Sequence, residues 1–415
     1  MKYIDLKTPS YIVDEEKIRE NLEILKGVQN SSGCKILLAE KAFSMFRIYP
    51  LIAEYLSGTT ASGIYEAKLA HEEFHVNAGS EGKPEGAGNE GNPETEVNPT
   101  KPENHVFEPA YKPEEMQELC RICTHIYFNS IAQLELHRPI WEPYQKAGKL
   151  KIALRINPEF STQEGHEIYD PCSPGSRLGI RRSQLPAHLP EGVTGLHFHT
   201  LCEQKEQPLI DTFRSVEGNF GSYLSEISWI NLGGGHHITA EGYDVERLNG
   251  FLREVRERYG FEDIYLEPGE AVALNAGTLI ASVLDIVETE DMPTLILDAS
   301  AACHMPDVLE MPYTPPLFGA VPWADVAEDG GSEKGLVPVR LAARTCLAGD
   351  IIGIYGMPAV PKVGDILTFG DMAIYSMVKN NTFNGMALPD IVLKQGEEYE
   401  LVKRFGYQDF KERLS

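Results

Sequence analysis

The chain has 415 residues, enough for a large core, and its apolar and charged fractions of 42% and 24% are those of a globular protein. Its formal net charge of −25 disfavours nucleic acids and anionic membranes as partners, because both require basic surfaces, and it is compatible with a small cationic substrate. The N-terminal segment has no signal-peptide pattern and no apolar run reaches membrane-spanning length, so we expect a cytoplasmic protein. The seven irregularly spaced cysteines do not indicate a disulfide framework.

Short β-branched segments alternate with helical patterns from residue 35 onward, which is typical of parallel βα units. The eight predicted strands are 36–40, 59–62, 105–108, 125–128, 152–156, 195–199, 229–232 and 264–267. Predicted helices between them include 45–56, 63–74 and 245–259. This strict alternation of eight strands with helices favours an α/β fold, a closed (β/α)8 barrel over residues 20–270.

Residues 77–104 interrupt the alternation. They contain five Gly, four Pro, six Glu and five Asn, with no aromatic residue. Such a segment cannot bury enough apolar surface to offset the entropy lost on ordering. We therefore expect a disordered or surface insertion within the barrel domain.

A second, β-rich domain is predicted after residue 270, where strands follow one another between turn residues. Its predicted strands are 278–287, 294–298, 337–342, 350–354, 366–368 and 372–377. The segment 10–13 is also strand-like and is expected to join this domain. Its predicted extent is therefore 1–19 plus 271–415.

Lys41 follows the first predicted barrel strand, at the end where barrel active sites lie. Partial desolvation at such a position lowers the pKa of an amine and makes it a candidate for Schiff-base formation. A lysine that merely extends to solvent from a strand end is the alternative. Glu40 precedes it in an otherwise apolar strand and, by alternation, should point into the layer between barrel and helices, with no evident partner.

Three further motifs stand at the same predicted end of the barrel. Gly233, Gly234 and Gly235 follow the seventh strand, where their backbone N–H groups could approach a phosphate closely. Glu267 ends the eighth strand, and His199 ends the sixth. A carboxylate opposite a Schiff-base lysine, beside a phosphate cradle, is what pyridoxal phosphate chemistry requires, because the acid keeps the pyridine nitrogen protonated.

The order of these motifs resembles that in the fold type III pyridoxal phosphate decarboxylases, the relatives of ornithine and diaminopimelate decarboxylase, which have an alanine-racemase-like barrel. Two further motifs continue the resemblance, at 345–350 (TCLAGD) and at Tyr375 with 381–385 (NTFNG). Segments resembling those of carboxynorspermidine decarboxylases are 58–62 (GTTAS), 197–203 (HFHTLCE), 231–237 (NLGGGHH), 267–271 (EPGEA) and 304–312 (HMPDVLEMP). The resemblance extends over nearly the whole chain except the insertion.

The resemblance implies cofactor contacts by Lys41, Arg155, His199, Gly233, Gly234, Gly235, Glu267 and Tyr375. Lys41 would hold the cofactor as a Schiff base, and His199 would stack on its ring. Arg155 would lie near the ring hydroxyl, and Glu267 would pair with the ring nitrogen. The glycines and Tyr375 would hold the phosphate.

The resemblance also implies a shared active site. Cys346 matches the cysteine that protonates the α-carbon once carbon dioxide has left, and in this family it comes from the second subunit. A homodimer is therefore expected, with Lys41, Cys346 and His199 as the catalytic residues. No metal is required by this chemistry.

Candidates for binding substrate amines are the acidic residues Glu270, Asp307, Glu203 and Asp350. Many relatives have an arginine where Glu270 stands, and a carboxylate there would attract a cationic amine instead. Leu347 follows Cys346 where ornithine decarboxylase has an acid, which argues against ornithine. The expected reaction is decarboxylation of carboxynorspermidine or carboxyspermidine to norspermidine or spermidine in polyamine biosynthesis.

Three alternatives stay open at this point. One is another basic amino acid decarboxylase of the same fold, with a substrate like diaminopimelate. A metal-dependent barrel hydrolase is suggested by His197 and His199 together with the pair His236 and His237. A homologue that only binds a partner or a polyamine is the third.

Overall fold

The computed structural model describes residues 2–75, 102–163, 167–327 and 335–415. Eight parallel strands close into a barrel in the order of the chain. They are β2 (Lys35–Ala39), β3 (Gly58–Ala61), β4 (Glu103–Phe107), β5 (His125–Phe128), β6 (Lys151–Arg155), β7 (Val193–His197), β8 (Trp229–Asn231) and β9 (Asp263–Leu266). The predicted alanine-racemase-like (β/α)8 barrel is confirmed, and every predicted barrel strand overlaps an observed one.

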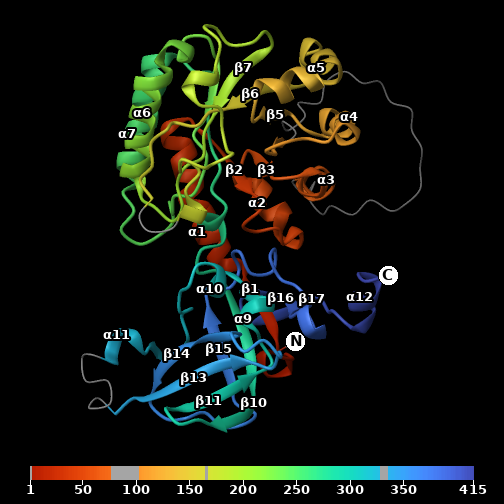
Figure 1. The fold of residues 1–415 in the computed structure, drawn as a ribbon, viewed down its shortest axis with the longest axis vertical. Helices are drawn as coiled ribbons and strands as arrows, with labels where there is room; N and C mark the ends of the chain where they lie inside the picture. The colour runs from red at the N-terminus through yellow and green to blue at the C-terminus, as the bar shows by residue number, and fades with distance from the viewer. Residues whose placement is uncertain (1, 76–101, 164–166, 328–334) are drawn as a thin grey trace.

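Helices cover the outside of the barrel (Figure 1). They are α1 (Glu15–Ser32), α2 (Tyr49–Tyr55), α3 (Ile64–Glu73), α4 (Pro113–Ile122), α5 (Ile131–Lys146), α6 (Glu206–Leu224) and α7 (Val245–Tyr259). Local sequence sets the bounds of α1: the Asp14 carboxylate accepts hydrogen bonds from the N–H groups of its first turn, and Gly33 ends it in the left-handed conformation. The apolar faces of these helices pack on the outward side chains of the strands.

The second domain is a mixed sheet of nine strands in the described part of the chain. Its strands are β1 (Ser10–Asp14), β10 (Gly277–Glu288), β11 (Pro293–Leu297), β12 (Val321–Pro322), β13 (Val337–Ala343), β14 (Ile351–Met357), β15 (Ile366–Gly370), β16 (Asp390–Gln395) and β17 (Glu398–Lys403). Strand β1 lies between β10 and β16, so the N-terminal segment joins this domain as expected. The remaining α-helices of the described residues are short: α8 (Glu270–Ala273), α9 (Ala301–His304), α10 (Asp307–Glu310), α11 (Ala324–Ala327) and α12 (Tyr407–Glu412).

Several predicted boundaries are wrong. Most of the predicted insertion 77–104 falls outside the described residues, but its last two residues, Glu103 and Asn104, belong to strand β4. Residues 372–377 form no strand; they make turns in which Tyr375 has a positive φ of 46°. Strands β12, β16 and β17 were not predicted. The division at residues 20 and 270 stays a prediction, and α1 runs across the first of these positions.

No helix among the described residues combines the length and apolar character needed to cross a bilayer. All seven cysteines are free thiols, in agreement with the absence of a predicted disulfide framework.

Candidate active site

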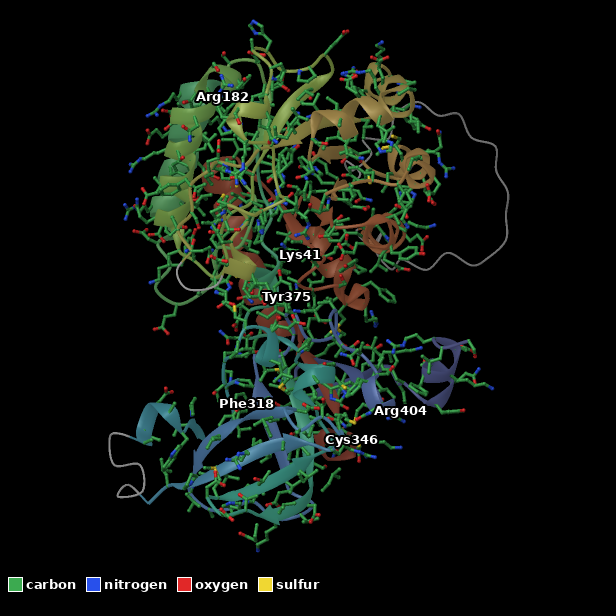
Figure 2. The ribbon with its side chains drawn as sticks, viewed as in Figure 1. Lys41, Arg182, Phe318, Cys346, Tyr375 and Arg404 are labelled. Carbon is green, nitrogen blue, oxygen red and sulfur yellow. The ribbon has the colours of Figure 1, made fainter. Side chains whose placement is uncertain are left out.

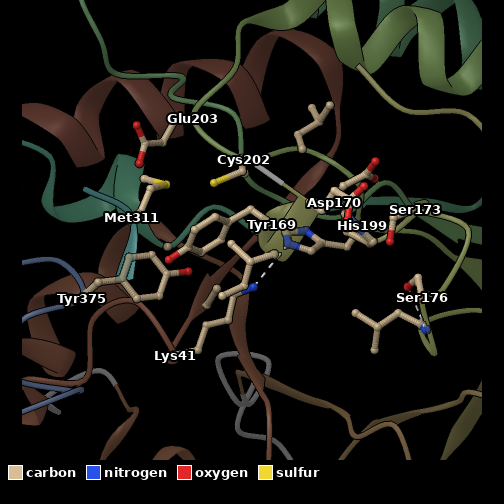
Figure 3. Close-up of a pocket in the computed structure, with 18 of the residues that line it drawn as sticks. Lys41, Tyr169, Asp170, Ser173, Ser176, His199, Cys202, Glu203, Met311 and Tyr375 are labelled. Atoms are coloured by element: carbon tan, nitrogen blue, oxygen red, sulfur yellow. Dashed lines mark hydrogen bonds between the residues drawn. The ribbon is translucent and has the colours of Figure 1, made fainter. Parts of the chain in front are cut away.

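A cavity of about 560 Å³ opens at the carboxyl ends of the barrel strands, where the barrel meets the second domain. This volume is in the range of small-molecule sites. Nine of the predicted site residues line it: Lys41, Arg155, His199, Glu203, Gly235, Glu267, Glu270, Asp307 and Tyr375. Figure 3 shows Lys41 and Tyr375 facing each other across it, with His199 beside the lysine.

Lys41 and His199 form the centre of the cavity. Lys41 Nζ lies 3.2 Å from His199 Nε2, and the N–H of Gly234 donates to His199 Nδ1 over 2.9 Å. Burial lowers the pKa of His199 well below its usual value, so the ring is neutral and its one hydrogen is on Nε2. His199 then donates to Lys41, which requires an unprotonated amine. Burial, reinforced by the charge of Arg155, lowers the pKa of Lys41 in the same sense.

Glu267 is the buried acid of the site, with a residue exposure of 8%. His197 Nε2 donates to one of its carboxylate oxygens over 3.2 Å, and Asn231 Nδ2 donates to the other over 2.7 Å. Burial raises its pKa, but the interactions with His197 and Asn231 outweigh this effect and place the pKa at about 2. Glu267 is therefore a carboxylate across the physiological pH range.

Arg155 ends strand β6 and is 5% exposed. It donates to the carbonyl oxygen of His199 over 3.0 Å, and its guanidinium lies 4.4 Å from the centre of the Phe107 ring. Burial lowers the pKa of Arg155 to about 10, which still leaves it charged at neutral pH. Arg155 thus places a fixed positive charge on the wall next to Lys41.

The glycine turn after β8 fits only residues without a side chain. Gly233 and Gly235 have φ of 74° and 83°, in the left-handed region. A Cβ at Gly234 would lie 2.0 Å from the carbonyl oxygen of Glu267, and one at Gly235 would lie 1.8 Å from that of Leu201. Close packing against the backbone of neighbouring strand ends therefore requires glycine at these positions. Gly235 lines the cavity, whereas Gly233 and Gly234 support it from behind.

Acidic residues occupy the outer wall of the cavity. Glu270 accepts a hydrogen bond from His237 Nε2 over 3.0 Å, and Asp307 bonds to Lys379 and, over 3.4 Å, to the Tyr169 hydroxyl. Burial, together with the charge of Glu270, raises the pKa of Glu203. Figure 3 shows Glu203 on the same side as Tyr375.

Asp350 and Cys346 lie apart from this cavity. Asp350 is 2% exposed and accepts hydrogen bonds from Ser300 Oγ, Thr345 Oγ1 and the N–H of Ala302, so it supports a loop of the second domain rather than facing the cavity. Its contact with the substrate stays a prediction. Cys346 is exposed on the second domain, away from Lys41 of the same chain (Figure 2).

Sequence reasoning missed several residues that support the site. Asn231, His197 and Tyr169 bond to predicted site residues, and His237 pairs with Glu270. Three of them stood in motifs that were quoted for other reasons: Asn231 lies two residues before the glycine turn, His237 lies two residues after it, and His197 begins the H-x-H motif. Tyr169 carried no such signal.

The four histidines that suggested a metal hydrolase have separate partners. His197 bonds to Glu267, His199 to Lys41, His236 to Tyr243 and His237 to Glu270. Among the described residues, the one group of side chains with suitable ligand spacing is Glu103, His105 and His125, at the opposite end of the barrel.

The cavity residues fit pyridoxal phosphate. The aldehyde of this cofactor requires an amine, and burial lowers the pKa of Lys41, which lies 3.2 Å from His199. Its ring nitrogen requires a carboxylate, and Glu267 is kept ionised. Its phosphate requires backbone N–H groups, and the glycine turn reaches the cavity at Gly235. Lys41, Glu267 and the glycine turn would make these contacts.

Comparison with known proteins gives the class. The model of the family described as "Pyridoxal-dependent decarboxylase, C-terminal sheet domain" matches residues 10–373. The chain is therefore a pyridoxal phosphate-dependent decarboxylase. Within this class it belongs to the carboxynorspermidine/carboxyspermidine decarboxylase family, as full-length similarity shows. The predicted family, enzyme class and cofactor are confirmed.

The similarity covers whole chains. The carboxynorspermidine/carboxyspermidine decarboxylase of Campylobacter jejuni is 37% identical over 100% of both chains, and the carboxyaminopropylagmatine decarboxylase of Synechocystis is 37% identical over 99% of this chain and 96% of its own. The structure of Campylobacter jejuni carboxynorspermidine decarboxylase complexed with norspermidine matches with a TM-score of 0.82, at 36% identity, over 98% of this chain and 100% of its own. The fold is shared more widely, since Helicobacter pylori diaminopimelate decarboxylase matches with a TM-score of 0.75 at 17% identity, over 99% of this chain and 98% of its own.

Proposed function

We propose that this enzyme decarboxylates carboxynorspermidine or carboxyspermidine, giving norspermidine or spermidine. The observation that carries the proposal is the composition of one cavity. Its inner end holds Lys41, His199 and Glu267, and its outer wall holds the carboxyl groups of Glu203 and Glu270. An amino acid with a polyamine side chain presents its α-amine to the first set and its distal amines to the second.

The acidic wall suits a cationic ligand although part of its charge is already paired. Asp307 bonds to Lys379, and Glu270 bonds to His237. No basic side chain in the described part of the chain lies within ion-pair distance of Glu203. Glu203 is therefore the acid most readily paired with a substrate ammonium, because that contact breaks no existing ion pair. Asp307 would first have to release Lys379.

We assign the residues around Lys41 the following roles. Pyridoxal phosphate, when bound, accepts the electron pair that the carboxylate leaves behind. Lys41 supplies the unprotonated amine that attaches it, and His199 holds that amine by the 3.2 Å hydrogen bond. Glu267, which stays ionised, would keep the ring nitrogen of the bound cofactor protonated. Arg155 gives the same wall a fixed positive charge.

Phosphate binding is assigned to the glycine turn and Tyr375. Gly235 carries the contact proposed for the turn, because it lines the cavity, whereas the N–H groups of Gly233 and Gly234 already donate to Asn231 Oδ1 and His199 Nδ1. Tyr375 lines the same cavity, and its backbone N–H donates to the carbonyl oxygen of Ala42, beside Lys41. These contacts place the phenol near the cofactor lysine.

The proton for the α-carbon is assigned to Cys346 of a second copy in a homodimer. The Cys346 loop is tied down, since its N–H donates to Asn384 Oδ1 over 2.7 Å, while its thiol is exposed. This bond joins the two motifs at 345–350 and 381–385. An exposed thiol on a rigid loop, distant from Lys41 of its own chain, is positioned to serve a neighbouring site.

A second candidate substrate is carboxyaminopropylagmatine. The Synechocystis enzyme that carries this name is 37% identical to the chain, the same identity as the Campylobacter jejuni enzyme. A guanidinium end would pair with carboxylates through two parallel hydrogen bonds. The acids Glu203, Glu270 and Asp307 could bind either kind of cation.

The test is carbon dioxide release measured with carboxynorspermidine, carboxyspermidine, carboxyaminopropylagmatine, diaminopimelate and ornithine. We expect the highest kcat/KM with one of the two carboxylated triamines, and a preference between these two of about 10- to 200-fold at most, because they differ by one methylene. Glu203→Gln should raise KM for the triamine more than it lowers kcat, whereas Glu310→Gln, at the exposed side of Lys379, should change neither. A higher kcat/KM with diaminopimelate or ornithine would refute the proposal.

A further inference from the structure

Polar side chains run through the interior of the barrel from Glu267 to the opposite mouth. Asn231 Nδ2 lies 2.7 Å from Glu267 Oε1 and 2.8 Å from the Tyr127 hydroxyl. That hydroxyl lies 2.5 Å from His105 Nδ1, and His105 Nε2 lies 3.0 Å from Glu103 Oε2. Asn231, Tyr127 and His105 are fully buried, so these bonds have no competition from water.

The direction of every bond in this chain is fixed. The N–H of Gly233 donates to Asn231 Oδ1 over 2.9 Å, which orients the amide and leaves both hydrogens of Nδ2 for Glu267 and Tyr127. Because the hydroxyl of Tyr127 accepts from Asn231, its own hydrogen goes to His105 Nδ1. His105 then carries its hydrogen on Nε2 and donates to Glu103.

Glu103 anchors the far end of the chain at the amino-terminal mouth of the barrel. Its other oxygen accepts from Lys35 Nζ over 2.7 Å, and Lys35 also pairs with Asp263 at 2.9 Å. Burial raises the pKa of Glu103, but its interactions with His105 outweigh this effect and lower the pKa overall. An ionised Glu103 can only accept, and this property selects the hydrogen position on His105.

We propose that Glu103 and His105 are positioning residues for the pyridine nitrogen of the cofactor, acting through Tyr127 and Asn231 on Glu267. Glu103 and His105 fix the hydrogen of the Tyr127 hydroxyl, so that Asn231 Nδ2 donates to both Tyr127 and Glu267. Glu267 then accepts a hydrogen bond and does not need a proton of its own. Glu267 therefore stays ionised and ready to accept from the ring nitrogen. The inference rests on the role proposed above for Glu267.

In Glu103→Gln the Lys35 ammonium would hold the amide oxygen, so the amide N–H would face His105 Nε2 and the acceptor there would be lost. His105 could then place its hydrogen on Nδ1, facing Tyr127. The Tyr127 hydroxyl would lose its acceptor, and its other neighbour, Asn231 Nδ2, offers only hydrogens. Reversing the amide would bring Asn231 Oδ1 against the Glu267 carboxylate. The reversed amide would lose the bonds to Glu267 and to the Gly233 N–H, whereas the unreversed amide would lie beside a Tyr127 hydroxyl that has no acceptor.

The chain is a positioning network and not a route for protons. Asn231 donates in both directions, and an amide nitrogen cannot accept the hydrogen that a relay would pass to it. A buried metal is the other reading of this region, since the ligand atoms of Glu103, His105 and His125 lie within 4.8 Å of one another. Lys35 already pairs with Glu103 at this point, which favours the hydrogen-bonded form.

The test measures cofactor affinity in the apoenzyme, with pyridoxal phosphate and with an analogue in which carbon replaces the ring nitrogen. We expect Glu103→Gln to weaken pyridoxal phosphate roughly tenfold and to leave the affinity for the analogue unchanged. Asp263→Asn is the matched control, because Asp263 belongs to the same mouth cluster and pairs with Lys35 without contacting His105. It should bind both compounds as the wild type does.

Several outcomes would overturn the inference. They are an unchanged affinity in Glu103→Gln, an equal loss for both compounds, or an equal loss in Asp263→Asn. Restoration of tight binding by added zinc, or its loss from the wild type on treatment with a chelator, would support the metal reading instead.

Glu267→Gln should abolish the preference for pyridoxal phosphate over the analogue; if it does not, the role of Glu267 fails. Both readouts are independent of substrate choice, and circular dichroism verifies that each variant is folded.

Discussion

Lys41 Nζ and His199 Nε2 are 3.2 Å apart, and the Gly234 N–H occupies the other ring nitrogen of His199. This arrangement lets the histidine donate to the lysine only when the amine carries no proton. The hydrogen bond therefore favours the nucleophilic form of Lys41 before any ligand arrives. The hydrogen bonds of His199 to Lys41 and to the Gly234 N–H therefore favour the form of the lysine that can attach the cofactor.

Lys41→Ala should abolish both the visible absorbance of the bound cofactor and turnover, because Lys41 is the amine held by His199, whereas Lys379, which also lines the cavity, is paired with Asp307 and Glu310. Spectra and carbon dioxide release measured on the purified variant test this directly. Lys68→Ala, which removes a half-exposed lysine paired with Glu118, is the control and should keep both properties. A Lys41→Ala enzyme that retained the absorption band and full turnover would disprove the assignment.

Glu267→Gln should lower kcat about 100-fold, equivalent to about 2.7 kcal/mol of transition-state stabilisation, with a smaller change in KM. The amide cannot keep the ring nitrogen protonated, and the electron pair is then poorly accepted. Steady-state kinetics of the holoenzyme give both constants. Glu254→Gln on the exposed face of α7 is the matched control and should behave as the wild type. Full kcat in Glu267→Gln would contradict the role.

Much of the architecture could be predicted, because a (β/α)8 barrel requires a regular alternation of strand and helix patterns in the sequence. Each buried parallel strand is a short apolar run, each helix has the 3.6-residue period, and the ends of the strands mark the site. Lys41, Glu267 and the glycine turn are all recognisable in this way.

The residues that support the site could not be predicted. Strands of a parallel barrel are buried on both faces, so the sequence does not show which side chains point into the barrel and which point toward the helices. His105 and Tyr127 are inward polar positions that only closure of the barrel brings together. The segment 372–377 reads as a strand, yet Tyr375 takes a positive φ there and the chain turns instead. The hydroxyl groups of Ser300 and Thr345 donate hydrogen bonds to the Asp350 carboxylate, and nothing in the sequence indicates these two partners.

His237 should make the stability of the enzyme depend on pH. Burial alone would lower its pKa, but the ion pair with Glu270 outweighs this effect and raises the pKa above its usual value. The stabilisation is therefore fully present below about pH 6.5 and is lost as the pH rises through the raised pKa. His237→Gln should reduce the free energy of unfolding by about 1 kcal/mol at pH 6, and by less at pH 9.

Urea unfolding at both pH values measures this difference. His188→Gln is the matched control, because His188 also pairs with a glutamate but its side chain is 86% exposed, against 19% for His237. We expect no pH-dependent change in that variant. An equal loss at pH 6 and pH 9 in His237→Gln would mean that packing, and not charge, is responsible.

Glu40 should cost the enzyme stability at high pH. Its side chain points away from the cavity, as expected; one oxygen accepts from the Tyr49 hydroxyl of α2 over 3.1 Å, and the other is buried without a partner. Burial, together with Glu66, raises the pKa of Glu40 well above its usual value. The folded state thus holds a proton that the unfolded chain releases above about pH 4.5, so stability falls as the pH rises from there toward the raised pKa.

Glu40→Gln should therefore increase the free energy of unfolding by about 1–2 kcal/mol at pH 8, because a neutral amide of the same shape needs no proton. Thermal or urea unfolding at pH 5 and pH 8 measures the effect, which should shrink at the lower pH. Glu54→Gln, at an exposed position of α2, the helix that carries Tyr49, should leave both values unchanged. A loss of stability at pH 8 in Glu40→Gln would show that Glu40 is charged and paired in the folded enzyme.

The shared active site can be tested by mixing two inactive variants. Lys41→Ala lacks the cofactor amine and Cys346→Ala lacks the thiol, so each homodimer should be inactive or severely impaired. Random reassortment of equal amounts makes half of the dimers mixed, and each mixed dimer has one site with both residues, so about a quarter of wild-type activity should return. Sedimentation of differently labelled variants shows whether the chains exchange. Mixed dimers that form and yet recover no activity would mean that Lys41 and Cys346 of different chains do not work together.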